Sequence, residues 1–323
     1  MLRYLVRRVL ASVPVLVVAS LITFWLVRVS VDPLAKFRRL RNSAQVIPKQ
    51  RHLLGLDRPI IAQWWKWVTH FVHGDMGVSS RTQDPVSSMI ARSLWPTLQL
   101  LFWGTIFSVA LAIVLGVYSA VKQYSIGDYV VTAFSYLGIA MPDFWLGLLA
   151  IGVLVTGPKV WFHLNTPIFY SIGLHNEGVK GFNLDYLRHI VLPAFVLTAS
   201  SVATWSRFER ASMLEVLNSD YVRTARAKGV PRRQVIFKHA LRNALIPFTT
   251  VTALDTAGLI AGVIIIEQIF SISGMGQGFL IALGAGDAQF LLSWFFFSAV
   301  AVIFVNLLAD VLYVVLDPRI RLS

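Results

Sequence analysis

The sequence predicts an all-α membrane protein with six transmembrane helices. Of its 323 residues, 56% are hydrophobic and 14% are charged, and the mean hydropathy is +0.66. Soluble domains average about 45–50% apolar and about 25% charged residues, so one water-soluble core would not hide this much apolar surface. The composition also excludes a disordered chain, collagen and a coiled coil. A polytopic membrane protein is the class that these numbers favour.

Apolar runs of the length that a bilayer requires, about 20 residues, occur along the whole chain. They are Val9–Val27, Ser93–Val121, Tyr129–Pro158, His189–Ser206, Asn243–Ile269 and Ala288–Leu316. The first run is longer than the apolar part of a signal peptide and no A-x-A cleavage pattern follows it, so we expect an uncleaved span. We expect the third run to form one long helix that Pro142 kinks.

The distribution of Lys and Arg predicts that both termini lie in the cytoplasm. The short loops on the predicted outer side hold only Lys159, Lys180 and Arg188, whereas the N-terminus and the segment 207–246 are rich in basic residues. Positive charge in short loops marks the cytoplasmic side. The predicted parts are the cytoplasmic N-terminus with the first span (1–28), an extracytoplasmic module (29–92), and a five-helix core (93–323) that carries the cytoplasmic segment 207–246.

The extracytoplasmic module contains three sequence patterns. Leu54–Ile60 reads LGLDRPI, Trp64–Trp67 reads WWKW, and Gly74–Ser79 reads GDMGVS. Tryptophans next to a span are typical of an interfacial anchor. His70 and His73 lie three residues apart, but no convincing third ligand is near them in the sequence, so no metal site is predicted.

The net charge of +13 belongs to basic residues that lie between the apolar runs. This placement indicates membrane topology and attraction to anionic lipid headgroups, not a surface that binds nucleic acid. The chain has no cysteine. The absence of cysteine removes disulfides, cysteine-based metal sites and thiol nucleophiles from consideration, and leaves the redox compartment undecided.

The segment 207–246 contains a short helix with clear signals at both ends. Ser219 or Asp220 can cap its N-terminus, and Gly229 can adopt the left-handed conformation that closes a helix. Arg226 and Lys228 bring positive charge to its C-terminal end, where the helix dipole favours cations. Pro231 then suits the first turn of a next helix, predicted over Pro231–Asn243.

A helix of this length is marginal alone in water, because isolated helices shorter than about 12 residues rarely hold. It therefore needs a partner surface. The alternative interpretation is a solvated basic loop that lies on lipid headgroups.

Two stretches of this segment resemble the EAA-type motif of ABC importer permeases, in the form found in dipeptide and oligopeptide transporters. They are YVRTARAKG at Tyr221–Gly229 and KHALRNALIP at Lys238–Pro247. An ordered series of further matches extends over almost the whole chain: Tyr4–Arg8, Leu54–Ile60, Gly74–Ser79, Trp95–Leu98, Met141–Trp145, Leu192–Ala194, Ser212–Leu217 and Asp310–Arg319. The chain looks like the B-type permease subunit. In Phe270–Gly276, Ser273 stands where the family commonly has proline.

The resemblance implies a type I ABC importer permease fold in a bacterial cytoplasmic membrane. It also implies that the short helix docks on a cytoplasmic ATPase subunit, through Asp220, Tyr221, Arg223, Thr224, Ala225, Arg226, Ala227, Lys228 and Gly229. The partners that it implies are two ATPase domains, a second permease and an extracytoplasmic solute-binding protein. The chain has no G-x-x-x-x-G-K-[ST] loop, so ATP and Mg²⁺ are expected on partner subunits and no enzymatic activity or cofactor is expected here. The implied cargo is peptides, with nickel or glutathione as alternatives.

Four acidic residues fall within the apolar runs: Asp143, Asp255, Glu267 and Asp310. Ionisable groups at membrane depth usually face a bundle interior or a water-filled path. Asp143, Asp255 and Glu267 are candidates for the translocation path. For Asp143, which follows Pro142, a structural role in satisfying backbone donors freed by a kink is favoured, and for Asp255 and Glu267 interhelical hydrogen bonding is an equally good explanation. On one helix Asp255 and Glu267 would lie roughly 120° apart, so both would line one path only in a wide cavity or at a helix break.

Two rival functions remain open at this stage. A proton-coupled secondary transporter would use Asp143, Asp255 and Glu267 and would show an inverted internal repeat. It would not explain the helix at Asp220–Gly229. A membrane enzyme would need a catalytic cluster near the interface, and the sequence contains no H-E-x-x-H and no G-x-S-x-G pattern.

Overall fold

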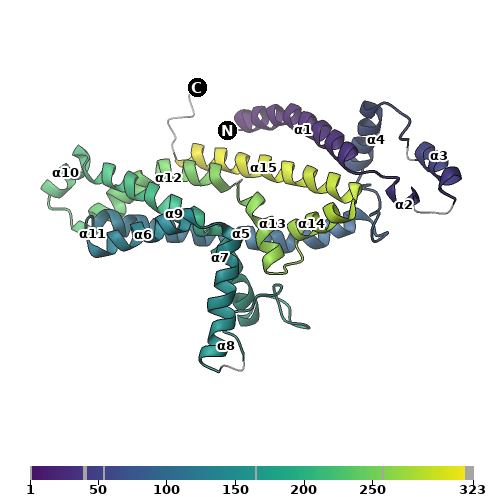
Figure 1. The fold of residues 1–323 in the computed structure, drawn as a ribbon. Helices are drawn as coiled ribbons and strands as arrows, with labels where there is room; N and C mark the ends of the chain where they lie inside the picture. Colours follow the sequence, from purple (N-terminus) through teal and green to yellow (C-terminus); the bar gives the residue numbers. More distant parts are fainter. Residues whose placement is uncertain (1, 39–41, 54, 164–165, 257, 317–323) are drawn as a thin grey trace. The chain divides into compact units, whose positions relative to one another are not determined.

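The computed structural model describes residues 2–38, 42–53, 55–163, 166–256 and 258–316, and these residues form helices joined by loops (Figure 1). Strand pairing within these ranges is confined to one antiparallel bridge between Val78 and Pro85. The predicted all-α class is therefore confirmed. The end of the C-terminal motif, Asp317–Arg319, lies outside the described residues, as does the side chain of Asp310.

Most helices follow one another with short connections, and longer ones join α4 to α5 and α8 to α9. The α-helices are α1 (Leu2–Ser30), α2 (Ala35–Arg38), α3 (Ser43–Leu53), α4 (Ile60–Val72), α5 (Val86–Val121), α6 (Ile126–Ala140), α7 (Asp143–Ala150), α8 (Gly157–Trp161), α9 (Leu184–Leu217), α10 (Asp220–Ala227), α11 (Arg232–Gln234), α12 (Leu241–Thr256), α13 (Leu259–Ile269), α14 (Met275–Ala285) and α15 (Ala288–Leu316). Two π-helical segments, η1 (Ile151–Thr156) and η2 (Val235–Ala240), join α7 to α8 and α11 to α12.

Among the described residues, five helical segments are long and apolar enough to cross a membrane: Val6–Ser30, Val86–Val121, Asp143–Trp161, Leu184–Leu217 and Ala288–Leu308. Each corresponds to all or part of a predicted apolar run. The fifth predicted run is divided between α12 and α13, and each of these helices is too short to cross a membrane by itself.

The prediction of one long third span is wrong. The chain leaves the helical conformation at Met141 (ψ 126°) and Pro142 (ψ 137°), so α6 ends at Ala140 and α7 begins at Asp143. The proline ring disfavours a helical conformation in the residue before it. The helix therefore ends at this point and a new one starts, where a kink was expected.

The predicted helix boundaries in the fifth run are also wrong. Helix α12 ends at Thr256 and α13 starts at Leu259, so Asp255 and Glu267 lie on different helices. The angle expected for one continuous helix no longer applies to them. Upstream, Pro231 precedes the helix with ψ 139°, and the helical run then continues from α11 through η2 into α12. The separate Pro231–Asn243 helix is not formed.

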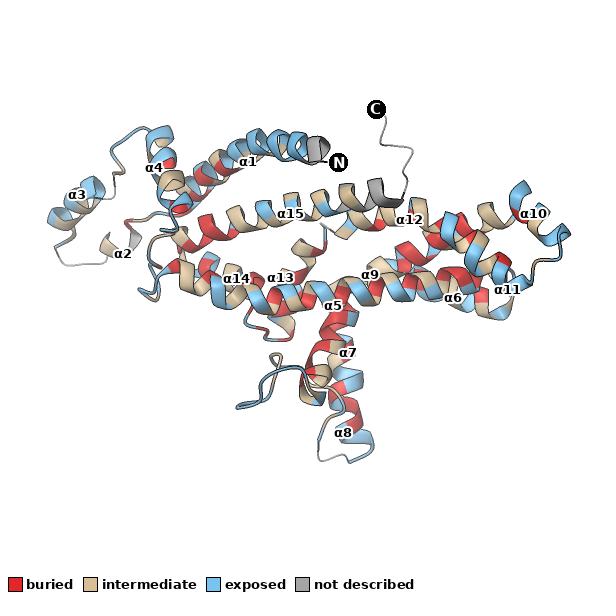
Figure 2. Ribbon diagram, turned by 180° about the vertical axis from the view of Figure 1, so that it is seen from behind, coloured by how far each residue is buried: buried red, intermediate tan, exposed pale blue. Residues whose placement is uncertain are grey.

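The described chain divides into two compact units. The first contains Thr97–Ile272 and the chain from Phe304 onward. Its central element is α9, which packs against α6, α7, α12 and α13. More than half of the most apolar stretch of α9 is buried. Figure 2 shows the buried residues of this helix in red. Fully buried side chains such as Leu197, Ile266 and Phe270 form the core around it.

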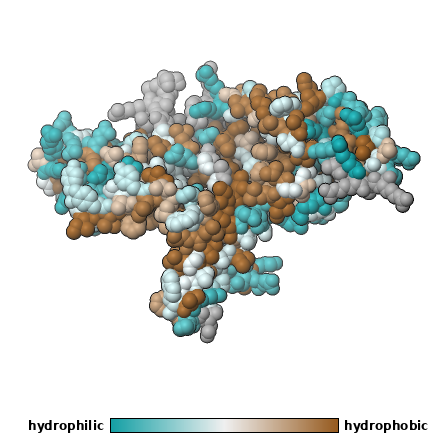
Figure 3. All heavy atoms as spheres, viewed as in Figure 1, coloured by the Kyte–Doolittle hydropathy of each residue, from teal (hydrophilic) through white to brown (hydrophobic). Residues whose placement is uncertain are grey.

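Helix α7 of this first unit keeps an apolar exposed face. Phe144, Trp145 and Leu148 are each about half exposed, and the surface over α7 is brown in Figure 3, which marks hydrophobic residues. Apolar side chains on a membrane-spanning helix are stable against lipid or against another transmembrane helix. This face of α7 can therefore pack against lipid or against another transmembrane helix.

The second unit contains Leu2–Pro96 and Ser273–Ile303. In it, the outer end of α1 packs on α4, where Phe24 lies against Trp67 and Trp64 donates a hydrogen bond to Ser20 Oγ at 3.2 Å. Most of α1 is exposed, as the pale blue ribbon in Figure 2 shows. Exposure of a long apolar helix is expected where lipid or a partner covers it.

The GDMGVS pattern is held by the start of α15. Asp287 is buried directly before α15 and accepts hydrogen bonds from the hydroxyl of Ser79 and from the backbone amides of Ser80 (3.2 Å) and Phe290 (3.5 Å). It therefore caps α15 and fixes the loop at the same time. Gly77 has φ +78° and a side chain there would crowd Gln289, so the loop requires glycine at this position.

Candidate functional site

The short helix predicted in the segment 207–246 is present as α10, from Asp220 to Ala227. Ser219 takes the extended conformation of a helix cap, but its hydroxyl donates to the carbonyl oxygen of Val216 at 2.6 Å. The predicted capping hydrogen bond from the Ser219 side chain is therefore absent. The acidic side chain of Asp220 lies in the first turn, where the helix dipole favours a negative charge.

The C-terminal end of α10 forms a Schellman motif. Gly229 has φ +73°, its amide donates to the Arg226 carbonyl at 3.0 Å, and the Val230 amide donates to the Ala225 carbonyl at 3.2 Å. These two bonds satisfy carbonyls that the helix end would leave unpaired. The predicted left-handed glycine is confirmed. A Cβ at Gly229 would meet nothing within 4 Å, so only the backbone conformation demands glycine here.

Two contacts attach α10 to the rest of the first unit. Val222 is completely buried, and the side-chain amide of Asn243 in α12 donates to the hydroxyl of Tyr221 at 3.0 Å. Sequence reasoning did not single out Val222, although an apolar residue in a polar helix is the signal that would have identified it. The contacts orient α10 and couple its position to α12.

The other face of α10 is open to solvent. The exposed residues are Asp220, Tyr221, Arg223, Thr224, Arg226, Ala227, Lys228 and Gly229, and Ala225 is partly exposed. The structure therefore places all the predicted docking residues together on one short helix whose buried anchor is Val222. Arg223 forms an exposed ion pair with Asp220 at 3.6 Å, which contributes little to stability.

A pocket of about 550 Å³ lies beside the helix, lined by residues that include Leu217, Arg226, Val230 and Val235. It opens between the end of α9, the turn after α10 and the start of η2. Sequence reasoning missed it, because its walls come from segments that only the fold brings together.

A buried ion pair joins α6 to α9 in the same unit. Arg210 donates from Nε to Asp128 Oδ1 at 2.9 Å and from Nη2 to Asp128 Oδ2 at 2.8 Å. Ser119 of α5 also donates to Asp128, and Ser125 caps α6 by accepting from the Asp128 amide. In the sequence, the N-terminal cap of α6 is indicated by the pattern Ser125-x-x-Asp128, which is typical of a capping box. Sequence reasoning overlooked it.

Helices α5 and α9 approach closely where Glu209 meets Gly116. A Cβ at Gly116 would lie 2.7 Å from the Cβ of Glu209, so no larger residue fits. Glu209 is fully buried, and neither of its carboxylate oxygens has a hydrogen-bond partner within the described part of the chain. Its burial is costly, since an unpaired buried carboxyl group loses its solvation without compensation.

The three acids predicted for the translocation path have different surroundings. Glu267 on α13 is fully buried and accepts from Thr97 Oγ1 at 2.5 Å. Asp255 on α12 is exposed, and its carboxylate accepts from Trp205 Nε1 at 2.9 Å. Asp143, at the start of α7, is partly buried and hydrogen-bonded to Ser200. Each acid is thus bonded to a neighbouring helix, and Asp255 is the one that remains open.

No group of three or more potential metal ligands occurs among the described His, Asp and Glu residues. His70 instead pairs with Asp75 at 3.0 Å. Its partner is a carboxylate of the following loop.

Comparison with known proteins identifies the family. Residues 112–322 match the family described as the inner membrane component of binding-protein-dependent transport systems, and residues 1–101 match its N-terminal region. The chain is 37% identical to the oligopeptide transport system permease protein OppB of Mycobacterium tuberculosis, with all of both chains covered. It is 37% identical to the oligopeptide permease AppB of Bacillus subtilis, with 99% of this chain and 100% of the relative covered.

The dipeptide transport system permease protein DppB of Escherichia coli is 36% identical, with 99% of each chain covered. These matches extend over the apolar helices and over α10 alike, and they confirm the resemblance that the motifs from Tyr4 to Pro247 indicate. The chain is a multi-pass membrane protein that belongs to the family of inner membrane permeases of binding-protein-dependent ABC importers.

Proposed function

We propose that this chain is a permease subunit of an ATP-driven importer for peptides in a bacterial cytoplasmic membrane. The observation that supports peptides as the cargo is that relatives matched over their full length, at 36–37% identity, are named for oligopeptide and dipeptide transport. Nickel and glutathione, the alternatives open from the sequence, receive no comparable support. Selectivity would rest largely with a separate solute-binding protein.

The coupling to ATP would pass through α10. Its exposed face, from Asp220 to Gly229, would dock on a cytoplasmic ATPase subunit, and its buried side chain Val222 would pass the movement of that subunit to the membrane helices. A helix closed at its C-terminal end by a Schellman motif and bonded to α12 through Tyr221 moves as one rigid element. The partner subunits would hold ATP and Mg²⁺, and the permease itself would not hydrolyse ATP.

The chain would work in an assembly with a second permease, two ATPase domains and a solute-binding protein. The exposed apolar faces of α1 and α7 support burial against lipid or another permease. The module 29–92 and the loop 157–188 would receive the solute-binding protein on the outer side. Transport would follow alternating access, and a ligand shifts such an equilibrium only if it binds the two states with different affinity.

Asp255 is the acid that we assign to the translocation path. Its carboxylate is exposed next to the break between α12 and α13, whereas Glu267 is completely enclosed and bonded to Thr97. An exposed carboxylate beside an interrupted helix can meet the amino group of a peptide. Glu267 would instead hold α13 against α5.

The test is purification of the chain from native membranes in mild detergent, followed by identification of the co-purified subunits and an ATPase assay. The proposal predicts two ATPases and a second permease, with hydrolysis stimulated by solute-binding protein loaded with peptide. A complex of this composition that responds to nickel or glutathione, and not to peptides, would contradict the cargo. A stable protein without partners would contradict the importer itself.

A further inference from the structure

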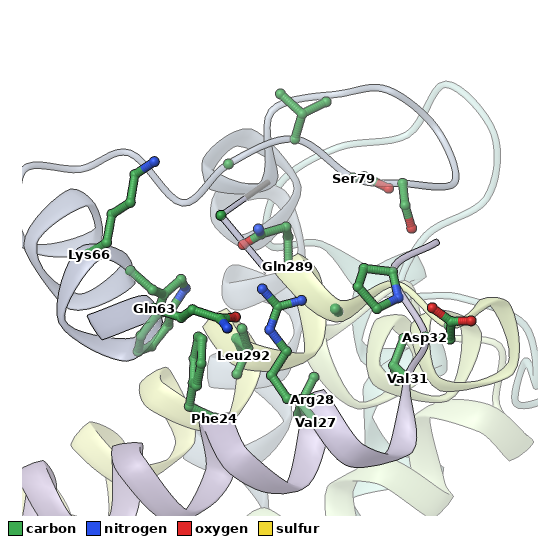
Figure 4. A pocket seen from close by; sticks show the side chains of 18 of the residues that line it. Phe24, Val27, Arg28, Val31, Asp32, Gln63, Lys66, Ser79, Gln289 and Leu292 are labelled. Atoms are coloured by element: carbon green, nitrogen blue, oxygen red, sulfur yellow. The ribbon is translucent and has the colours of Figure 1, made fainter. Parts of the chain in front are cut away.

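The second unit contains a pocket of about 930 Å³ at the outer end of α1. Its walls come from α1, α4, the loop around Ser79 and the start of α15 (Figure 4). The guanidinium group of Arg28 lies in its interior, between Gln63 of α4 and Gln289 of α15. None of the residues in this pocket belongs to α10 or to the acids considered above.

The charges around the pocket do not balance. Its three acids each have a basic partner: Asp32 pairs with Arg38 at 2.9 Å, Asp57 with Arg51 at 3.1 Å and Asp75 with His70 at 3.0 Å. The hydrogen bond from His70, with one from the Gly77 amide, lowers the pKa of Asp75, so this carboxylate stays ionised and paired. The three acids are therefore already paired, and none of them is the counter-ion of the remaining basic side chains of the pocket.

The arginine and lysine side chains that line the pocket have no such partners. Arg28, Arg58 and Lys66 make no ion pair with any described residue. Arg58 and Lys66 are exposed at the rim, whereas Arg28 is only partly exposed and packs over Phe24 with its guanidinium carbon 5.6 Å from the ring centre. A partly buried cation without a counter-ion favours an anionic ligand.

Unpaired polar atoms occur on the two walls that α1 and α4 form. Arg28 Nε and Trp67 Nε1 are buried donors, and Gln63 Oε1 is a buried acceptor, and within the described part of the chain none of the three has a hydrogen-bond partner. Nearly all buried polar groups in folded proteins are satisfied, so three unsatisfied groups at one pocket point to a missing ligand. That ligand must offer acceptors to two donors and one donor to an acceptor.

Next to its pocket residues, α1 keeps an exposed apolar face. Val17, Val18 and Ile22 are each about half exposed, whereas the cleft of about 20 Å³ between α1 and α15 has room for about one water molecule. From Arg28 to Leu16 is about 18 Å along a helix at 1.5 Å per residue. Polar groups at one end of α1 and an exposed apolar face of this length beside them fit a lipid, with its headgroup at Arg28.

We infer that this pocket binds an anionic phospholipid with a hydroxyl-bearing headgroup, the chemistry of phosphatidylglycerol. The phosphodiester oxygens accept from Arg28 Nε and Trp67 Nε1, a headgroup hydroxyl donates to Gln63 Oε1, and one acyl chain lies along the exposed apolar face of α1. Lys66 and Arg58 at the rim add to the attraction for the negative charge. The bound lipid fastens α1 to α4 and α15.

The test uses the full chain, purified with its co-expressed partner subunits and placed in nanodiscs of phosphatidylcholine and phosphatidylglycerol. Native mass spectrometry measures the phosphatidylglycerol that is retained after mild delipidation. We expect retention by the wild type and a loss of roughly tenfold in Arg28→Gln, with a smaller loss in Trp67→Phe, because charge-assisted hydrogen bonds are the stronger ones. Arg92→Gln is the matched control, since Arg92 is exposed, lies outside the pocket and, among the described residues, bonds to Ser88 of its own helix.

Three outcomes would overturn the inference. Equal retention of phosphatidylcholine by the wild type would show that only the apolar face of α1 binds lipid. Binding of inorganic phosphate in phosphatidylcholine nanodiscs, lost in Arg28→Gln and without any preference for phosphatidylglycerol, would assign the site to a soluble anion. Unchanged lipid retention in Arg28→Gln together with weaker binding of the solute-binding protein would assign Arg28 to a protein interface.

Discussion

Arg210 holds the carboxylate of Asp128 with two hydrogen bonds, of 2.9 and 2.8 Å, and so locks α9 to the first turn of α6. Helix α9 ends at Leu217, and α10 begins only three residues later, at Asp220. The pair therefore fixes the end of the helix that carries α10. Through α9 this pair connects α10 to α6, and the hydrogen bond of Tyr221 connects α10 to α12.

Removal of one partner of this pair should destabilise the chain strongly. Arg210→Gln leaves the buried carboxylate of Asp128 without a counter-ion, and breaking buried ion pairs typically costs about 3–5 kcal/mol. The measurement is thermal unfolding of the purified complex in detergent. Arg207→Gln is the control on the same helix, because Arg207 is exposed and contacts Tyr136. Similar unfolding temperatures for the two variants would show that the pair has no structural role.

The contact between Thr97 and Glu267 should be structural. Thr97→Val keeps the size of the side chain and removes the hydroxyl that donates to the buried carboxyl group of Glu267. Loss of a partner from a buried polar group costs about 1–3 kcal/mol. Thr97→Ser retains the hydroxyl and should unfold close to the wild-type temperature. Equal stability of the valine and serine variants would refute the role of this hydrogen bond.

Asp255 and Glu267 should respond differently to neutralisation. Asp255→Asn keeps an oxygen that accepts from Trp205 Nε1, so the fold should be unaffected while peptide uptake falls several-fold through loss of the charge. Glu267→Gln also keeps an oxygen that accepts from Thr97 Oγ1, so both the fold and the uptake per folded complex should remain near the wild-type level. The measurement is uptake of labelled peptide into proteoliposomes, normalised to folded protein. If uptake falls in Glu267→Gln and not in Asp255→Asn, the assignment of the path is wrong.

Local sequence signals predicted the features that depend on neighbouring residues. Gly229 was identifiable because a glycine after a polar helix is typical of a left-handed helix end, and the structure has that conformation. The long apolar runs predicted the spans for a similar reason, since bilayer thickness sets their length. Ser219 shows the limit of such signals, because its hydroxyl bonds backward to Val216 in place of capping α10.

Features that depend on the folded arrangement were not predictable. The break between α12 and α13 lies within a continuous apolar run, so composition alone gave no boundary. Arg210 and Asp128 are 82 residues apart in the sequence, and neither residue type by itself indicates a pair. The pocket around Arg28 takes its walls from α1, α4 and α15, which only the fold brings together.

The proposed coupling through α10 is tested most directly at Gly229. A valine there is strained by about 1–2 kcal/mol, because residues with a Cβ disfavour the left-handed conformation. The Schellman motif would be lost while Val222 still anchors the helix. Asparagine tolerates positive φ better than most residues, so Gly229→Asn is the matched control.

The measurement is ATP-driven peptide uptake at equal amounts of membrane-inserted protein. We predict that Gly229→Val lowers uptake at least tenfold with normal insertion and that Gly229→Asn retains most of it. Normal uptake by Gly229→Val at wild-type expression would contradict the account.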